Sequence, residues 1–363
     1  MDTILDYVRW RGDLSFSQSA LNEVDGVVFA RLAYLPYETI PQERSGADFS
    51  VAKVAAAFLS QKDSTLSEQD RSLLMLLREC ERYRALKLFA YEVCTDEETQ
   101  TQFAAISVEL PQDGAFLAFR GTDNTLVGWK EDFNMSFVFP VPAQRLALEY
   151  LEQVSRRVQG RLRLGGHSKG GNLAVYAAAF CPASLQCRIV DVYNYDGPGF
   201  TEQTLQNAGF SAILARVHTF VPQSSIVGMT LSHEEAYSIV HSLQKGIWQH
   251  DMYSWEVRRT DFVKLQTVDN SSRFIDGTLK AWLSKLDEQQ RAVFIDTIYD
   301  IMRQTNATTL RELTDNWLES AVAVTRAMAN LDEPTRKTVL YALGLLLKST
   351  REGFIQLLPV RNA

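Results

Sequence analysis

The spacing of apolar and polar positions predicts helices in the first part of the chain. Residues 1–60 mix short apolar stretches with polar breaks, and residues 66–90 carry apolar side chains on a charged background. Within 66–90 the apolar positions recur every three to four residues, which is the period of an amphipathic helix. We therefore expect a helical N-terminal approach over residues 1–87.

From Leu88 the pattern changes to short β-rich runs, each closed by glycine, proline or a polar turn. These runs are LFAYEVCTDEETQTQFAAISVEL, GAFLAFRG, RLRLGGHS, RIVDVYNYDG and ARVHTFVP. Helical stretches stand between them, notably 143–158 and 171–180. Strands that alternate with helices predict an α/β fold with a mainly parallel central sheet flanked by helices, and such sheets bind ligands at the carboxyl ends of their strands.

The strand pattern stops after about Arg258, and the remaining chain has the spacing of amphipathic helices. No internal repeat and no Pro/Gly-rich linker sets this part off from the rest. We therefore predict a main domain over 1–258 and a C-terminal all-helical region over 259–363 that packs on it. The expected helices cover 274–286, 288–305, 310–329 and 333–349.

Composition excludes several classes of function. Hydrophobic residues make up 46% of the chain and charged residues 22%, which is the balance of a globular protein with a sizeable core. The net charge of -7 argues against a nucleic-acid partner, because phosphate binding needs clustered Lys and Arg. The N-terminus carries Asp2, Asp6 and Arg9 where a signal peptide needs an apolar stretch, and no later segment approaches the length of a membrane span. A cytoplasmic protein without an integral membrane segment is expected.

The four cysteines favour neither disulfides nor metal binding. Cys80, Cys94, Cys181 and Cys187 are few and irregularly spaced for a chain of 363 residues. The last two are near each other but lack the CxxC spacing and the nearby histidines of a zinc site. We expect reduced thiols, no metal and no other cofactor.

The strongest chemical signal is Gly166-His167-Ser168-Lys169-Gly170, which lies between an apolar run and a helix rich in small residues. This is the pattern of a nucleophile elbow. Such an elbow holds its serine in a strained turn, and glycines two residues away on either side let the strand and the helix approach closely. The pattern predicts Ser168 as a nucleophile.

A second motif, FRGT at 119–122, follows the apolar run 115–118, about where an oxyanion loop belongs. An acyl-transfer enzyme places backbone N–H groups at the developing oxyanion, one after the nucleophile and one from an earlier loop. Lys169 and Thr122 are the candidates for these donors. Trp129, Glu131 and Asp132 follow the loop and are expected to hold it in place.

These motifs together resemble a known family. The order FRGT, GWKEDF and GGHSKGGNLA resembles the pattern of fungal-type, class 3 lipases. The whole chain is similar to a family of uncharacterised bacterial lipase-like α/β-hydrolases, in which DYVRWRGDLSF, NEVDGVVFARLAYL, NYDGPGF and QHDMYSW look like recurring signatures. The similarity covers about residues 1–258. It implies an α/β-hydrolase fold and a serine-dependent site, and it implies no particular substrate.

A nucleophilic serine needs a base, and in α/β-hydrolases the acid and then the histidine follow the serine along the chain. Of the five histidines, His250 lies after the last predicted strand, where the loop that carries the base belongs. His241 is the next candidate and, with His233, flanks a predicted lid or helix. His167 is expected to point away from the serine, and His218 lies within a predicted strand.

The acid is predicted from the ends of the strands. Class 3 lipases carry it after the strand that here reads HTFVPQSSIVG, and the matching position is Ser225, so the chain departs from that pattern. The preceding strand ends in NYDGPGF, which places Asp196 at a carboxyl end and resembles the acid position of pancreatic-type lipases. Asp196 is therefore favoured. Asp251 is adjacent to His250 in sequence, and its carboxylate would have difficulty turning back onto that ring.

Two features bear on the substrate. The Lys169 side chain either points to solvent or meets an anionic group of the substrate. The stretch 226–255 contains Met229, Leu231, Trp248, Met252 and Trp255, which form either an apolar acyl pocket or lid, or part of the core.

The predicted chemistry is acyl transfer to water, with a small-molecule ester or lipid as substrate. Ser168 attacks the ester carbonyl, His250 takes its proton and Asp196 orients His250. Two alternatives stay open. Because position 225 carries no acid, the chain is alternatively a catalytically silent hydrolase fold that serves as a binding or scaffolding module. An acyltransferase would use the same site with a different acceptor.

Overall fold

The computed structural model describes residues 1–40, 49–61, 66–123, 126–135, 138–225, 227–228, 230–267, 285–303, 331–342 and 344. Its contacts divide the chain into two compact units. The first comprises Met1–Cys94, Phe103–Gly121 and Ala143–Val268, and the second comprises Thr95–Gln102, Thr122–Pro142 and Asp269–Ala363. The second unit thus includes residues 95–102 and 122–142, which the sequence analysis assigned to the main domain.

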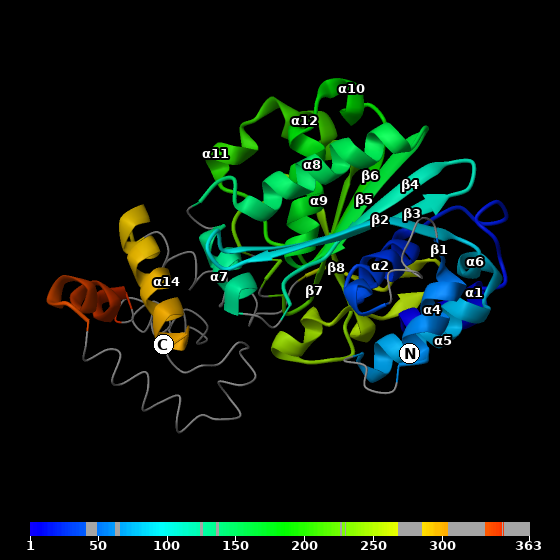
Figure 1. The fold of residues 1–363 in the computed structure, drawn as a ribbon, viewed down its shortest axis with the longest axis horizontal. Helices are drawn as coiled ribbons and strands as arrows, with labels where there is room; N and C mark the ends of the chain where they lie inside the picture. The colour runs from blue at the N-terminus through cyan, green and yellow to red at the C-terminus, as the bar shows by residue number, and fades with distance from the viewer. Residues whose placement is uncertain are drawn as a thin grey trace, which may run out of the picture. The chain divides into compact units, whose positions relative to one another are not determined.

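A sheet of nine strands runs through the structure in the order β1-β2-β3-β4-β5-β6-β7-β8-β11 (Figure 1). The strands from β4 to β8 are parallel, and β1, β3 and β11 pair antiparallel with β2, β4 and β8. The prediction of a mixed α/β fold with a large central sheet flanked by helices is confirmed. The strands are β1 (Phe49–Ser50), β2 (Lys87–Asp96), β3 (Thr101–Leu110), β4 (Gly114–Phe119), β5 (Arg161–His167), β6 (Ile189–Tyr195), β7 (Val217–Pro222), β8 (Tyr237–Val240) and β11 (Lys264–Leu265).

The crossover helices lie on one face of the sheet. Helix α8 (Pro142–Arg157) connects β4 to β5, α9 (Lys169–Phe180) connects β5 to β6, and α12 (Ala208–Ile213) precedes β7. Each new parallel strand joins the same edge of the sheet, and right-handed crossovers in one direction leave their helices on one side. Figure 1 shows α8, α9 and α12 together on that side. The opposite face must therefore be covered by another part of the chain.

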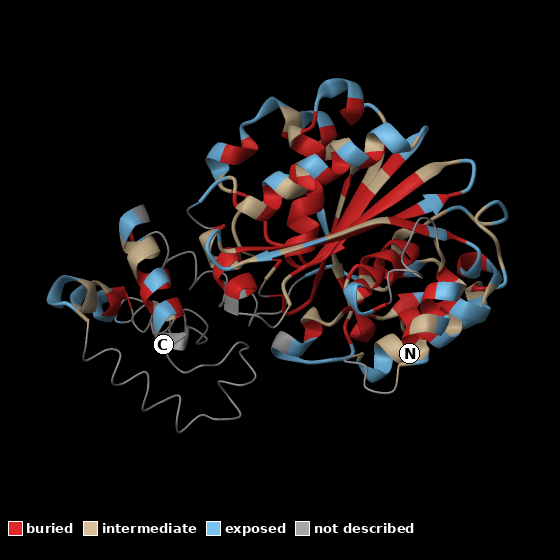
Figure 2. Ribbon diagram, in the orientation of Figure 1, coloured by how far each residue is buried: buried red, intermediate tan, exposed pale blue. Residues whose placement is uncertain are grey.

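Helices from the N-terminal part of the chain cover that opposite face, as Figure 1 shows. The central one, α2, is capped by the Asn22 side chain, which accepts hydrogen bonds from the Val24 and Asp25 N–H groups. Almost every residue of α2 is buried, as expected for a helix enclosed on all sides (Figure 2). The helices are α1 (Ile4–Arg11), α2 (Glu23–Leu32), α4 (Val51–Leu59), α5 (Glu68–Glu79) and α6 (Glu81–Arg84).

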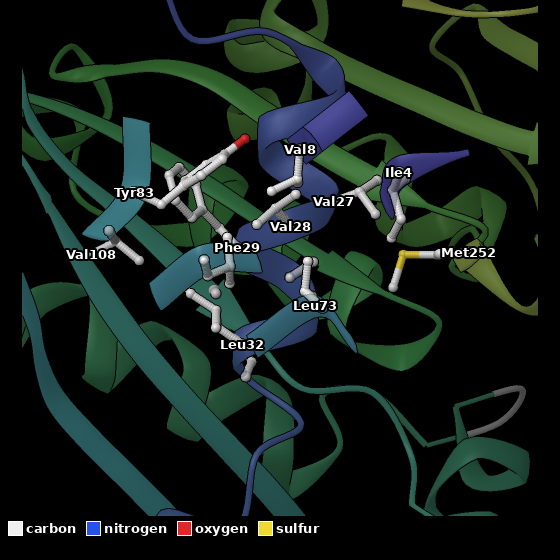
Figure 3. Close-up of a cluster of buried hydrophobic side chains, with 14 of the residues drawn as sticks. Ile4, Val8, Val27, Val28, Phe29, Leu32, Leu73, Tyr83, Val108 and Met252 are labelled. Atoms are coloured by element: carbon white, nitrogen blue, oxygen red, sulfur yellow. The ribbon is translucent and has the colours of Figure 1, made fainter. Parts of the chain in front are cut away.

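Two apolar cores follow from the alternation of side chains along the strands. In β4, Phe116 and Ala118 pack with the N-terminal helices, whereas Ala115, Leu117 and Phe119 pack with α8 and α9. The core on the N-terminal side gathers residues far apart in sequence (Figure 3). It includes Ile4, Val8, Val27, Val28, Phe29, Leu32, Leu73, Tyr83, Val108 and Met252.

The predicted elements differ from the structure in three places. The helix expected over 66–90 ends at Glu79, and strand β2 already begins at Lys87. Strand pairing does not stop at Arg258, because β9 (Val257–Arg258) pairs with β10 (Asp261–Phe262) and β11 adds an edge strand. The segment between His233 and His241, expected as a lid or helix, contains strand β8. Each of these late strands has only two to four residues, too few to show an alternating pattern.

The C-terminal helices are confirmed in part. Helix α14 (Glu288–Arg303) matches the one expected over 288–305, and residues 333–342 are helical. The helices expected over 274–286 and 310–329 lie outside the described residues. None of the described helices combines the length and apolar character of a membrane span. The remaining short elements are α7 (Leu126–Asn134), α10 (Ala183–Gln186), α11 (Glu202–Leu205), η1 (Tyr37–Thr39), η2 (Leu214–Arg216), η3 (Gly246–His250) and η4 (Met252–Ser254).

Candidate active site

Ser168 occupies the sharp turn between strand β5 and helix α9. Its backbone has φ 57° and ψ -133°, a conformation that is costly for a residue with a side chain. The turn is possible because of its glycines. A Cβ atom at Gly166 would lie 2.4 Å from the backbone of Gly170, and one at Gly170 would lie 2.2 Å from the Phe119 carbonyl oxygen. The structure therefore has the steric arrangement that the sequence pattern of an elbow predicts.

Asp196 and His250 are in direct contact, although 54 residues separate them. Asp196 follows β6 with φ 52° and is fully buried. Its Oδ2 atom lies 2.6 Å from Nδ1 of His250. An ionised carboxylate only accepts hydrogen bonds, so the Nδ1–H group of His250 donates and Nε2 remains the proton-accepting nitrogen. The imidazole is thereby oriented as a general base requires.

His250 lies alongside the elbow. The centroids of its ring and the ring of His167, the residue before Ser168, are 4.3 Å apart. Nε2 of His167 lies 2.7 Å from the backbone carbonyl oxygen of His250. On the other side, a Cβ atom at Gly197 would lie 2.4 Å from the Ser168 carbonyl oxygen, so the turn after Asp196 also packs against the elbow. The structure therefore gathers Ser168, Asp196 and His250 in one region.

Ser225, the position that the sequence comparison matched to the acid of class 3 lipases, contacts Asp196, the predicted acid. Its hydroxyl donates a hydrogen bond to Oδ1 of Asp196. The Gly228 N–H group donates to the same oxygen at 3.1 Å. Because His250 occupies Oδ2, both oxygens of the buried carboxylate have partners, as a buried charged group needs. Position 225 thus supplies no carboxylate of its own, but its hydroxyl is a hydrogen-bond donor to Asp196, which follows the neighbouring strand β6.

The loop after β4 runs past the elbow. A Cβ atom at Gly121 would lie 2.4 Å from the His167 carbonyl oxygen and 3.0 Å from Cβ of Ser168. Thr122, the next residue, belongs to the second unit, where its hydroxyl donates to Asp132 at 2.5 Å. In the same unit, the buried Glu131 accepts a hydrogen bond from the Gln102 N–H at 3.1 Å. The side chain of Trp129 lies outside the described part.

Lys169 corrects one expectation. Its side chain is only 1% exposed, so the alternative in which it points to solvent is wrong. Helix α9 is the crossover between the two central strands and is covered along nearly its whole length. The sequence around Lys169 does not indicate this enclosure, because the burial comes from elements far away in the chain. The backbone N–H of Lys169 is the first of helix α9 and follows the serine directly.

The apolar stretch 226–255 is core only in part, and Leu231 is partly exposed. Met252 and Trp255 are buried in the core on the N-terminal side, which confirms the interpretation of these two residues as core. Trp248 differs, because 70% of its surface is exposed. Ile226 and Met229 lie outside the described residues.

The three histidines outside the elbow region each contact a different carboxylate. His218 lies 3.0 Å from Asp191, His233 lies 2.9 Å from Glu235, and His241 lies 2.5 Å from Glu256. Each partner is thus a residue other than Asp196. The described residues contain no group of three or more His, Cys, Asp or Glu side chains placed to hold a metal ion.

Sequence analysis missed a group of residues from the N-terminal helices. The Tyr34 hydroxyl, just after α2, lies 3.0 Å from Nδ1 of His167. Arg31 pairs with Asp70 at 2.6 Å, and the Tyr253 hydroxyl donates to the same carboxylate at 2.7 Å. No local motif marks these residues, because helical spacing predicts a buried face without predicting its partners. They connect α2 and α5 to the elbow and to the loop after His250.

One family model matches the chain. The model of the Mbeg1-like family matches residues 77–300, which is 224 of the 363 residues. No curated protein matches the chain.

Proposed function

The chain belongs to the Mbeg1-like family, and we propose that it is a lipase-like or esterase-like serine hydrolase with an α/β-hydrolase fold. Its substrates are carboxylic esters, either small molecules or lipids. The observation that carries the proposal is the 2.6 Å contact between Asp196 and His250 beside the elbow of Ser168. The sheet adds support, because the serine and the acid follow two adjacent parallel strands, at the edge where such sheets bind ligands.

The proposed reaction begins when Oγ of Ser168 attacks the ester carbonyl carbon. Nε2 of His250 takes the hydroxyl proton, and the buried carboxylate of Asp196 stabilises the imidazolium that forms. The tetrahedral intermediate carries its negative charge on the former carbonyl oxygen. The N–H groups of Lys169 and Thr122 are the proposed donors to this oxygen. His250 then gives the proton to the leaving alkoxide, so that an alcohol departs and Ser168 stays acylated.

Water completes the cycle in the same geometry. His250 removes a proton from the water molecule as it attacks the acyl carbon. The second tetrahedral intermediate then collapses, the carboxylic acid departs, and His250 returns the proton to Oγ of Ser168. An ester is favoured over an amide because the motifs resemble those of lipases. We propose water as the acceptor, and the cytoplasmic location expected from the sequence stays part of the proposal.

The scaffold alternative rested on the missing acid at position 225. Ser225 donates to Asp196, and Asp196 in turn contacts His250, so the departure from the class 3 pattern no longer favours a silent site. The acyltransferase alternative shares every residue of the site. It differs only in which nucleophile resolves the acylated serine, and product analysis with added alcohols separates the two.

Labelling with a fluorophosphonate probe tests the proposal, because the probe reacts with an activated serine. We expect rapid labelling of the unmodified protein, no labelling of Ser168→Ala, and rates at least about a hundredfold lower for His250→Ala and Asp196→Asn. His218→Ala is the matched control, since His218 also contacts a carboxylate, Asp191, and should label normally. An unmodified protein that does not label would contradict the proposal and favour the scaffold.

A further inference from the structure

The structure assigns to Tyr34 and His167 the role of positioning residues that hold the base, His250, beside Ser168. This inference rests on the proposed function. Nδ1 of His167 lies 3.0 Å from the Tyr34 hydroxyl, and its Nε2 lies 2.7 Å from the carbonyl oxygen of His250. One imidazole thus links helix α2 to the backbone of the base.

The partners of His167 determine which of its nitrogens carries the proton. A carbonyl oxygen only accepts, so Nε2 must carry the hydrogen that it donates to His250. A neutral imidazole has one donor and one acceptor, so Nδ1 accepts the hydrogen bond from the Tyr34 hydroxyl. With the opposite tautomer, the Nε2 lone pair would face the His250 carbonyl and the hydrogen bond to the base would be lost. The Tyr34 hydroxyl, which lies 3.0 Å from Nδ1 and 3.3 Å from the His167 carbonyl oxygen, therefore adds to the preference for the tautomer that holds His250.

The charge of His167 matters because its ring packs on the base at 4.3 Å between centroids. During the reaction His250 becomes an imidazolium, and a second cation in contact would oppose that step. Burial, the neighbouring His250 and the Arg31 guanidinium hold the pKa of His167 well below its usual value. The ring therefore stays neutral beside the base, and His250 alone takes up the proton.

Tyr34 is itself held by the N-terminal helices. The Arg31 guanidinium lies over the Tyr34 ring at 4.7 Å and over the Tyr253 ring at 5.0 Å. Asp70 pairs with Arg31 and accepts a hydrogen bond from the Tyr253 hydroxyl. The segment 250–253 is thus held at both ends. His250 is linked through His167 to Tyr34, just after α2, and Tyr253 contacts Arg31 of α2 and Asp70 of α5. Arg31, Tyr34 and Asp70 all precede residues 77–300, so the site depends on residues upstream of the family match.

The test compares Tyr34→Phe with Tyr37→Phe. Both substitutions remove one phenolic hydroxyl from neighbouring positions, but the Tyr37 hydroxyl donates to the Leu32 carbonyl and has no contact with His167. We expect Tyr34→Phe to react with the fluorophosphonate about tenfold more slowly and to reach the same final stoichiometry, since a misplaced base slows each molecule. Tyr37→Phe should keep the unmodified rate. A purely structural role would lower the final stoichiometry and leave the rate constant of the folded molecules unchanged.

A second pair of substitutions addresses His167. His167→Gln keeps an N–H donor for the His250 carbonyl, whereas His167→Leu has none, so Gln should retain more of the labelling rate than Leu. Equal rates for the two variants, or a normal rate for Tyr34→Phe, would overturn the inference while Ser168→Ala and His250→Ala still support the proposed function.

A nuclear magnetic resonance measurement separates the inference from the activity. The ¹⁵N shifts of His167 should show one neutral tautomer, protonated at Nε2, in the unmodified protein and a mixture in Tyr34→Phe. This readout remains decisive if the unmodified protein does not label at all, an outcome that would contradict the proposed function alone. A single unchanged tautomer in Tyr34→Phe would overturn the inference.

Discussion

The two faces of the central sheet are covered in different ways. On the crossover face, α8 and α9 pack through alanines and through larger apolar side chains such as Leu151 and Leu173, all close in sequence to the strands they cover. On the N-terminal face, polar contacts join distant segments, and the Arg82 and Asp25 side chains form a fully buried ion pair. The crossover face thus carries helix α9, which follows Ser168, whereas the N-terminal face reaches His250, the proposed base, through Tyr34 and His167. We therefore expect substitutions on the two faces to differ in how they change the free energy of unfolding and the labelling of Ser168.

The largest effect is expected on the N-terminal face, from Arg82→Met. This change leaves the Asp25 carboxylate buried without its cation, although Tyr7 and Tyr83 still donate to it. Breaking one side of a buried pair costs about 3–5 kcal/mol. Urea unfolding should show that loss, whereas Arg78→Ala, which removes an exposed pair with Glu79, should change the free energy of unfolding by less than about 1 kcal/mol. A small effect of Arg82→Met would mean that the tyrosines alone can satisfy Asp25.

On the crossover face, Gly170→Ala should destabilise through overlap. The added methyl group would lie 2.2 Å from the Phe119 carbonyl oxygen, so β4 and α9 must move apart. Overpacking of this kind costs about 1–3 kcal/mol. Labelling of Ser168 should fall more steeply than stability, because the displaced loop follows β4. Among the described residues, no atom lies within 4 Å of a Cβ atom at Gly344, so Gly344→Ala is the control in the same unfolding assay. Unchanged labelling of Gly170→Ala would show that the elbow tolerates a wider turn.

Ser225→Ala tests how far the base depends on support for its acid. The substitution removes one donor to Oδ1 of Asp196 and leaves the Gly228 N–H in place. Loss of one buried hydrogen bond is worth about 1 kcal/mol, so we expect a labelling rate about fivefold lower. Ser224→Ala, next in the chain, is the comparison. An equal loss in both variants would mean that the turn, and not the hydrogen bond to Asp196, is responsible.

The smallest expected effect is the contribution of Asp70 to the pH dependence of the free energy of unfolding. Burial opposes ionisation of this carboxyl, but the Arg31 charge and the hydrogen bonds from Arg31, Ser67 and Tyr253 outweigh it and lower the pKa below 3.8. A lowered folded-state pKa contributes stability that is present above the unfolded value and is lost as pH falls through the folded value. Below about pH 4 the protein should therefore lose stability more steeply than Asp70→Asn does. Parallel acid unfolding curves for the two would contradict this.

The sequence predicts the parts of the site that depend on local rules. The glycine spacing around Ser168 predicts the elbow, a strand end predicts Asp196, and the chain order of α/β-hydrolases predicts His250. The structure adds the 2.6 Å contact between the last two. The parallel strands β4 to β7 were also predictable, because each has a run of β-rich residues, whereas the four-residue strand β8 was not.

The rest could not be predicted because it depends on partners far apart in the chain. Tyr34 meets His167 across 133 residues, and Tyr253 meets Asp70 across 183. The apolar sequence of a helix such as α2 predicts that the helix is buried, but no pattern within that sequence predicts which strands the helix covers. Lys169 shows the same limit, since its burial follows from the helices and strands around α9 and not from its own position in the helix.

The one-directional order of the parallel strands has a consequence for biosynthesis. Helix α2 packs on a face that is not complete until the last strands have been made, because Glu23 accepts a hydrogen bond from Phe262, 239 residues later. At about 5–20 residues per second, the ribosome needs roughly 12–50 s to translate that interval. During this time the N-terminal helices can pack on one another and on β3 and β4, but the surface that Trp255, Val257 and Phe262 cover in the native core stays open. The nascent chain should therefore recruit chaperones that shield early helices, and its release from them should follow the synthesis of residues near 262.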